Sequence, residues 1–184
     1  MPDFWPRLKD QDTLGASVLQ FLILTAARPG EARDARWNEI DLKAKLWTIP
    51  DDRMKGGKTH KVPLTNEVVK LLKSLPRMNE YVFPSPRAGK PISDVAVSKV
   101  PKALGRDVTA HGFRATFRTW AQEHTSYAEE VPELALARVN SDLTGTAYAR
   151  GELIDKRRIQ RAMCCRARGP GLLMSHQTLH RRWQ

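Results

Sequence analysis

The segment His111-Gly112-Phe113-Arg114 opens the most informative helix pattern in this chain. Phe113 is followed by Phe117 and Trp120 at the spacing i, i+4 and i+7, which predicts one apolar face on a helix over residues 111–124. His111 and Arg114 are three residues apart, so their side chains share one face of that helix. An imidazole beside a permanently charged, planar guanidinium suits the binding of a phosphate.

Four other segments accompany this helix and carry residues of related chemistry. They are Thr25-Ala26-Ala27-Arg28-Pro29-Gly30-Glu31, Lys55-Gly56-Gly57-Lys58-Thr59-His60-Lys61-Val62-Pro63-Leu64, Tyr81-Val82-Phe83-Pro84-Ser85 and Ala147-Tyr148, the last ahead of a basic helix. In their order and spacing, the five motifs resemble the catalytic set of the tyrosine recombinases, and more closely the prophage-type integrases of bacteria. The match runs from about residue 14 to about residue 158. In that family a lysine stands eight residues before the proline of a Val-Pro-Leu sequence, and Lys55 and Pro63 have this spacing here.

The resemblance implies phosphoryl transfer from a DNA strand to Tyr148, which would form a covalent 3′-phosphotyrosine. Arg28 and Arg114 would bind the non-bridging oxygens of the phosphate, where the transition state concentrates negative charge. Lys55 would protonate the leaving 5′-oxygen, and His111 would accept the tyrosine proton or bind the phosphate. No metal or other cofactor is expected in this chemistry.

Without the resemblance, each candidate also has an ordinary structural explanation. Arg28 could bond the carbonyls at a helix end, and Arg114 could form a surface ion pair with Glu123. Lysines in glycine-rich turns are usually solvated, so Lys55 alone would attract no notice. His111 could be a core histidine with its hydrogen bonds satisfied, and Tyr148 could be half-buried at a helix start.

One position departs from the family pattern. The family usually has a histidine, sometimes a tryptophan, ten residues before the tyrosine, and Arg138 stands there in the sequence Leu136-Ala137-Arg138. Arginine can also donate hydrogen bonds to a phosphate oxygen, so Arg138 is counted among the candidate catalytic residues. The alternative is a truncated, catalytically impaired integrase relic that acts only as a DNA-binding domain.

The charge balance favours a polyanionic partner. The chain of 184 residues carries 31 lysines and arginines against 20 acidic residues, a formal net charge of +11. Such a balance favours double-stranded DNA through phosphate contacts, although a basic housekeeping protein or an anionic membrane surface would also explain it. No apolar run reaches the ~18 residues of a membrane-spanning helix. The two cysteines are adjacent and suggest no disulfide framework, which indicates a reducing cytoplasm. The resemblance to bacterial integrases implies association with the bacterial nucleoid.

The pattern of apolar residues and turns predicts an α+β fold that is mainly helical with one small antiparallel sheet. Helices are expected over 14–27, 66–75, 94–104, 111–124, 128–138 and 147–161, and strands over 46–50 and 60–64. Thr65 or Asn66 would cap the second helix and Ser93 the third, which Pro101 would kink or shorten. This is the fold that the resemblance implies for the catalytic domain.

We expect a catalytic domain over residues 1–162 and a basic tail over 163–184, without the family's upstream DNA-binding domains. Residues 161–184 contain five arginines and no acidic residue. Such a segment could contact nucleic acid, or it could be translated out of frame from a decayed prophage gene. Cys164, Cys165, His176 and His180 could bind zinc, but adjacent cysteines lack the usual spacing and no metal site is expected.

The resemblance therefore predicts site-specific recombination, the integration and excision of a prophage, by a protein that would act as a tetramer on DNA. A third class, a type IB topoisomerase-like enzyme, shares the chemistry but relaxes supercoils as a monomer. Covalent capture of DNA would separate an active enzyme from a relic, and relaxation at generic sites would indicate the topoisomerase.

Overall fold

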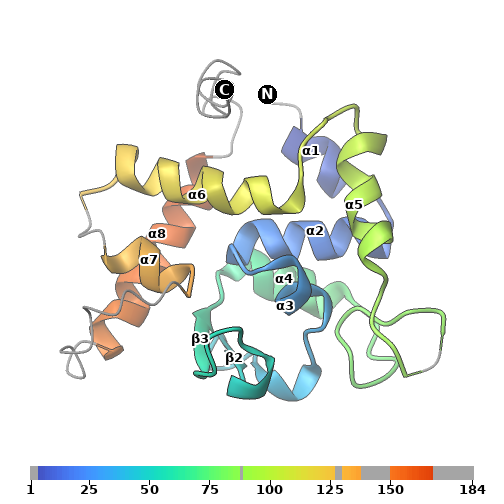
Figure 1. The fold of residues 1–184 in the computed structure, drawn as a ribbon, viewed down its shortest axis with the longest axis horizontal. Coiled ribbons are helices and arrows are strands. Elements are labelled where there is room, and N and C mark those ends of the chain that lie inside the picture. Colours follow the sequence, from blue (N-terminus) through green and yellow to red (C-terminus); the bar gives the residue numbers. More distant parts are fainter. Residues whose placement is uncertain (1–3, 88, 127–129, 138–149, 168–184) are drawn as a thin grey trace.

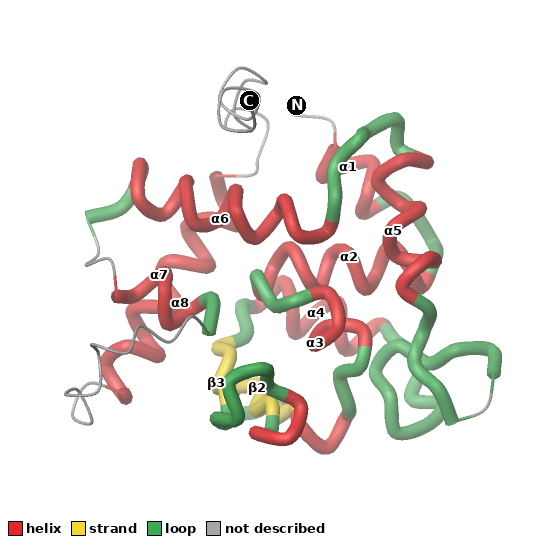
Figure 2. Tube along the Cα trace, viewed as in Figure 1, coloured by secondary structure: helices red, strands yellow, loops and turns green. Residues whose placement is uncertain are grey.

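A computed structural model describes residues 4–87, 89–126, 130–137 and 150–167 of the chain. Helices surround one central helix, α2 (Leu14–Thr25), and a small sheet lies at one side of it (Figure 1). Figure 2 shows the same arrangement coloured by secondary structure, with the strands confined to one short region among the helices. This architecture confirms the expected fold class, mainly helical with one small antiparallel sheet.

Helix α2 forms the centre of the core because its residues are apolar on all sides. Leu19, Phe21 and Leu22 are completely buried. The Phe21 ring lies 4.9 Å from the ring of Trp47 in the sheet, measured between centroids. Gly15 allows α5 (Asp94–Ala103) to approach, since a Cβ there would lie 2.6 Å from the carbonyl oxygen of Ala96. The central helix thus fixes the sheet on one side and α5 on the other.

The sheet has three antiparallel strands in the order β1 (Ile40–Asp41), β2 (Leu46–Ile49) and β3 (His60–Pro63). In the register of β2 and β3, Trp47 pairs with Val62 and Ile49 pairs with His60. The two longer strands were expected from the sequence, whereas the two-residue strand β1 was not. Two short 3-10 helices flank the sheet, η1 (Trp37–Glu39) and η2 (Asp51–Arg53). Strand β3 is therefore an edge strand, and the connection from η2 to β3 carries Lys55.

Several helices begin at the hydroxyl caps that the sequence indicates. The side chain of Thr65 accepts a hydrogen bond from the backbone N–H of Val68 in α4 (Asn66–Ser74), at 3.4 Å. Ser93 caps α5 in the same way, and Pro101 lies in its last turn. Thr109 caps α6 (Ala110–His124), so the helix that contains the segment 111–114 starts where expected.

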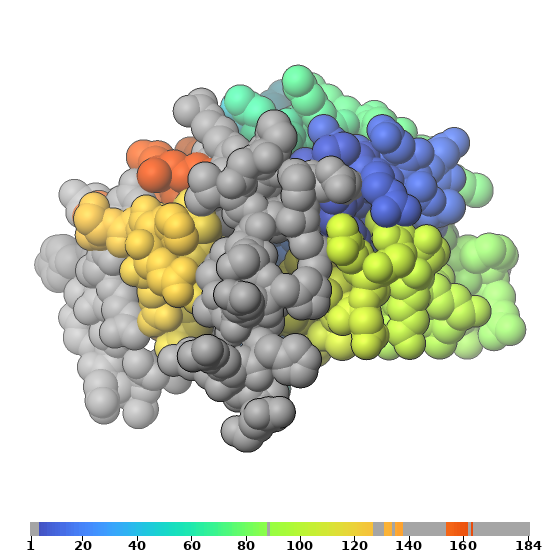
Figure 3. Space-filling model, turned by 90° about the horizontal axis from the view of Figure 1, so that it is seen from above, coloured from blue at the N-terminus to red at the C-terminus, as the bar shows by residue number. Residues whose placement is uncertain are grey.

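Helix α6 connects the central helix to the last two helices. It runs beside α2 (Figure 1), and its residues Phe117 and Trp120 form a second buried cluster with Leu136. Leu136 follows α7 (Glu130–Ala135), and α6 and α7 both contact α8 (Arg150–Ala167). At the other end of α6, Phe113 stacks on Phe4 of α1 (Phe4–Lys9), with ring centroids 5.5 Å apart. Figure 3 shows α1 in blue against the yellow-green segment that leads into α6.

Three helix ends differ from the sequence-based expectation. Helix α2 ends at Thr25 rather than residue 27, because Ala26 adopts a left-handed backbone conformation with φ 48°. Helix α7 ends at Ala135, and Ala137 is again left-handed with φ 49°. Helix α8 continues to Ala167, so the expected start of the tail at residue 163 falls inside a helix.

Candidate phosphate-binding site

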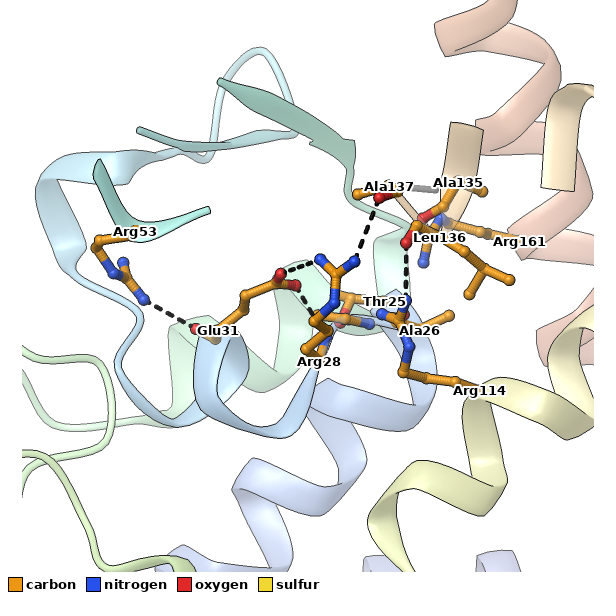
Figure 4. A network of polar contacts seen from close by, with 11 residues as sticks. Thr25, Ala26, Arg28, Glu31, Arg53, Arg114, Ala135, Leu136, Ala137 and Arg161 are labelled. Carbon is orange, nitrogen blue, oxygen red and sulfur yellow. Dashed lines mark hydrogen bonds and ion pairs between the residues drawn. The ribbon is translucent and has the colours of Figure 1, made fainter. Parts of the chain in front are cut away.

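Arg28 is held at the start of α3 (Pro29–Arg33) by the motif in which it occurs. Pro29 occupies the first position of the helix, and the Glu31 carboxylate accepts the backbone N–H of Arg28 at 2.9 Å. The same carboxylate accepts a hydrogen bond from Nη1 of Arg28 at 2.6 Å, while Nη2 donates to the carbonyl oxygen of Ala137 at 3.3 Å (Figure 4). Arg28 thus extends from its own short helix to the residues that follow α7.

Arg114 reaches the same place from α6. Its Nη1 donates to the carbonyl oxygen of Ala26 at 2.6 Å, and its Nη2 donates to that of Leu136 at 2.7 Å. Arg28 and Arg114 therefore bond the carbonyls of adjacent residues, Leu136 and Ala137, and their guanidinium groups lie close together (Figure 4). Two segments 86 residues apart in sequence supply one concentration of positive charge.

Two arginines of α8 extend this cluster, and no sequence motif singles them out. Nη2 of Arg161 donates to the carbonyl oxygen of Ala135 at 2.9 Å, and its guanidinium lies 5.6 Å from the ring centroid of Phe117. Nη2 of Arg157 donates to the carbonyl oxygen of Lys61 in β3 at 2.8 Å. Arginine is usually exposed, so no periodicity rule would have placed these two side chains inside. Arg161 is 1% exposed and Arg157 is 6% exposed.

His60 is a third residue that the sequence motifs did not identify. In β3 it lies on the same face as Val62, and its cross-strand partner Ile49 is completely buried. Burial lowers the pKa of His60 to about 3, with further lowering by the charges of Arg157, Arg161, Arg28 and Arg114. The imidazole is therefore neutral at physiological pH. The alternation of β3 was the available signal, because it puts His60 on the buried face.

Lys55 is exposed in the connection between η2 and β3, and the base of this connection is tied to the Arg28 motif. Arg53 forms an ion pair with Glu39, and its Nη2 donates to the carbonyl oxygen of Glu31 at 3.1 Å. Glu39 also accepts the Nε1–H of Trp47 at 2.9 Å. These contacts fix the segment before Lys55 and leave the lysine itself in solvent.

The remaining candidates are not joined to this cluster by any described contact. His111 lies in the first turn of α6 with its side chain exposed, one turn before Arg114. Arg138 and Tyr148 lie outside the described residues, although Ala137 precedes Arg138 directly and α8 begins two residues after Tyr148. The structure thus brings Arg28 and Arg114 together and adds His60, Arg157 and Arg161 to their surroundings.

Among the described residues, no group of three or more His, Cys, Asp or Glu side chains could hold a metal ion. The candidate zinc ligands His176 and His180 lie outside those residues, as do the side chains of Cys164 and Cys165. In the same part of the chain, no helix combines the length and the apolar character that a membrane crossing requires.

Comparison with known proteins identifies the family of the chain. Residues 6–150 match the model of the phage integrase family. Prophage integrase IntA of Escherichia coli strain K12 is 35% identical over 147 residues, which cover 77% of this chain and 35% of that protein. The integrase from mycobacterium phage Brujita superposes with a TM-score of 0.65 at 19% identity, covering 97% of this chain and 61% of that one. The recombinase XerH, in a pre-cleavage complex bound to its difH substrate, gives a TM-score of 0.52 at 18% identity over 91% of this chain and 45% of that one. The chain spans about a third of the length of the curated relatives it matches.

Proposed function

Because the chain belongs to the phage integrase family, we propose that it carries out site-specific DNA recombination, the integration and excision of a prophage. The observation that carries this proposal is the meeting of Arg28 and Arg114 on adjacent carbonyls. Their guanidinium groups would bind the two non-bridging oxygens of a scissile phosphate. Hydrogen bonds fix both groups before DNA arrives, so little reorganisation is required as charge develops in the transition state.

The proposed reaction exchanges one phosphodiester for another without loss of bond energy. The phenolic oxygen of Tyr148 attacks the phosphorus, the bond to the 5′-oxygen breaks, and a 3′-phosphotyrosine forms. The leaving 5′-oxygen takes a proton from Lys55, and His111 or another nearby group takes the tyrosine proton. Rejoining reverses these steps with a new 5′-hydroxyl as the nucleophile. Arg138 would assist at the phosphate from the position directly after Ala137.

The supporting electrostatics come from the surroundings of the two arginines. Arg114 and Arg161 donate to neutral carbonyl oxygens, which position a guanidinium without cancelling its charge. Arg28 uses two of its five N–H donors in described contacts, so donors remain for a phosphate. The partner is double-stranded DNA, bound by a tetramer in the bacterial cytoplasm at the nucleoid. Residues 1–162 would form the catalytic domain and residues 163–184 a basic tail.

A nicked suicide substrate tests the proposal. The short strand released after cleavage diffuses away, so an active tyrosine leaves a stable protein–DNA adduct that gel electrophoresis resolves. We expect the native chain to form the adduct and Tyr148→Phe to form none. DNA binding without an adduct would instead support an impaired relic, a reading favoured by Arg138 in place of the family's histidine. Relaxation of supercoils at generic sites would indicate a topoisomerase.

A further inference from the structure

Among the described side chains of helix α8, some polar residues are buried and some apolar residues are exposed. Arg157, Gln160 and Arg161 are buried, whereas Ile159 and Met163 are 52% and 41% exposed. Burying a guanidinium is costly even when it is hydrogen-bonded, and apolar side chains in such positions often stabilise a protein more. Burial also lowers the pKa of Arg157 to about 10. Stability alone therefore gives no reason for this arrangement, and the contacts that the two arginines make become informative.

Arg161 is one of three arginines that donate hydrogen bonds to consecutive backbone carbonyls at the end of α7. The carbonyl oxygens of Ala135, Leu136 and Ala137 accept hydrogen bonds from Arg161, Arg114 and Arg28 respectively. Figure 4 shows Arg161 on the side of this turn opposite to Arg28. Because carbonyls at a helix end lack partners within the helix, this turn has acceptors to offer to all three side chains. A shift of Arg161 would move the turn and, with it, Arg28 and Arg114, which together form the proposed phosphate clamp.

Arg157 holds a different part of the site. It lies one helical turn before Arg161 on the same face of α8, and it donates to the carbonyl oxygen of Lys61. Because β3 is an edge strand, its outer backbone groups have no neighbouring strand and are open to a side-chain donor. The connection that carries Lys55 runs directly into β3. The position of Arg157 therefore bears on where Lys55 can reach.

We propose that Arg157 and Arg161 are positioning residues of the recombination site. Arg161 fixes the turn that orders Arg28 and Arg114, and Arg157 fixes the strand that carries the lysine segment. This inference rests on the function proposed above. Helix α8 therefore joins the phosphate-binding arginines and the lysine segment through one element, and its first residue, Arg150, stands two positions after Tyr148 in the sequence.

The two roles predict different responses to a change of leaving group. In a 5′-bridging phosphorothiolate the leaving atom is sulfur, and a thiolate departs without the proton that an alkoxide needs, because a thiol has a pKa of about 8.5. We expect Arg157→Met to slow adduct formation by roughly 10- to 100-fold on ordinary DNA and to recover to within a few-fold on the phosphorothiolate, as Lys55→Ala should. Arg161→Met should form the adduct slowly on both substrates, because a sulfur leaving atom does not restore the positions of Arg28 and Arg114.

Arg158→Met is the matched control, since Arg158 is adjacent in α8 but partly exposed and paired with Asp155. It should react at the native rate on both substrates. The role of Arg157 is overturned if Arg157→Met matches this control, or if it is slowed equally on both substrates. The role of Arg161 is overturned if its variant recovers on the phosphorothiolate. If Arg157→Met does not fold, Arg157→Lys, which keeps one donor, is judged by the same comparison.

Hydrogen exchange provides a readout that does not depend on activity. Arg157→Met should accelerate amide exchange in residues 55–63, and Arg161→Met in residues 130–137, each leaving the other segment near its native rate. A uniform increase in both variants would overturn the inference even if the native chain forms no adduct. If only the adduct is missing while exchange responds as expected, the positioning contacts hold and the proposed function fails.

Discussion

The neutral state of His60 predicts a pH dependence of stability that one substitution can isolate. In the folded protein the pKa of His60 is about 3, and in the unfolded chain it returns to 6.5. Between these two values the unfolded state binds the extra proton, so stability falls as the pH falls below about 6.5. At pH 5 protonation stabilises the unfolded chain by about 2 kcal/mol relative to pH 8. This magnitude changes little for any folded pKa below ~4, because the folded imidazole is then still neutral at pH 5.

The matched variant is His60→Asn, which keeps a polar side chain but cannot titrate. Urea unfolding of both proteins at pH 8 and pH 5 gives four free energies of unfolding, and every other titrating group contributes equally to the two proteins. We expect the native protein to lose about 2 kcal/mol more than the variant between these pH values. An equal loss in both would mean that His60 titrates normally and that burial does not keep its imidazole neutral.

Three further outcomes follow from the charges and contacts of the site. Binding of duplex DNA, measured by fluorescence anisotropy, should vary little with sequence and should weaken with salt. The logarithm of the binding constant should fall against the logarithm of the salt concentration with a slope of about −0.9 per phosphate contact; a slope near zero would argue against a nucleic-acid partner. Arg138→His should raise adduct yield roughly 10- to 100-fold, because a guanidinium extends further than an imidazole and would hold the phosphate out of line; Tyr148→Phe in that background should give none, and an unchanged yield would contradict this explanation. Glu31→Gln removes the carboxylate that holds Arg28 and should cost about 1–3 kcal/mol in urea unfolding; no loss would mean that this contact is unimportant in solution.

The parts of the fold that local chemistry decides were predictable from the sequence. Thr65 and Ser93 cap their helices because a hydroxyl at that position accepts an N–H that has no helical partner. The strands β2 and β3 and the helix that carries Arg114 are likewise read from periodicity and turn residues. The short strand β1 was not predictable, because two residues provide no period to detect.

The residues of the site were likewise predictable only where they belong to a local sequence motif. Arg28 and Arg114 belong to motifs of distinctive composition, so the sequence could select them, although it could not supply their carbonyl acceptors. Arg157 and Arg161 lie in a run of basic residues where solvent exposure is the ordinary expectation for every member. Their burial depends on where β3 and the end of α7 lie in the folded protein. Only the tertiary structure brings those acceptors to one face of α8.

The choice of acceptors explains how several arginines can lie close together and still act on a phosphate. Like charges repel, and the carboxylate of Glu31 relieves part of that repulsion at Arg28. Carbonyl oxygens relieve part of it with dipoles, so Arg114, Arg157 and Arg161 gain fixed positions from neutral groups. A protonated His60 would add to this repulsion, and the imidazole avoids that cost because it is neutral. An incoming phosphate would then be the anion that completes the electrostatics of the cluster, which couples DNA binding to the order of the site.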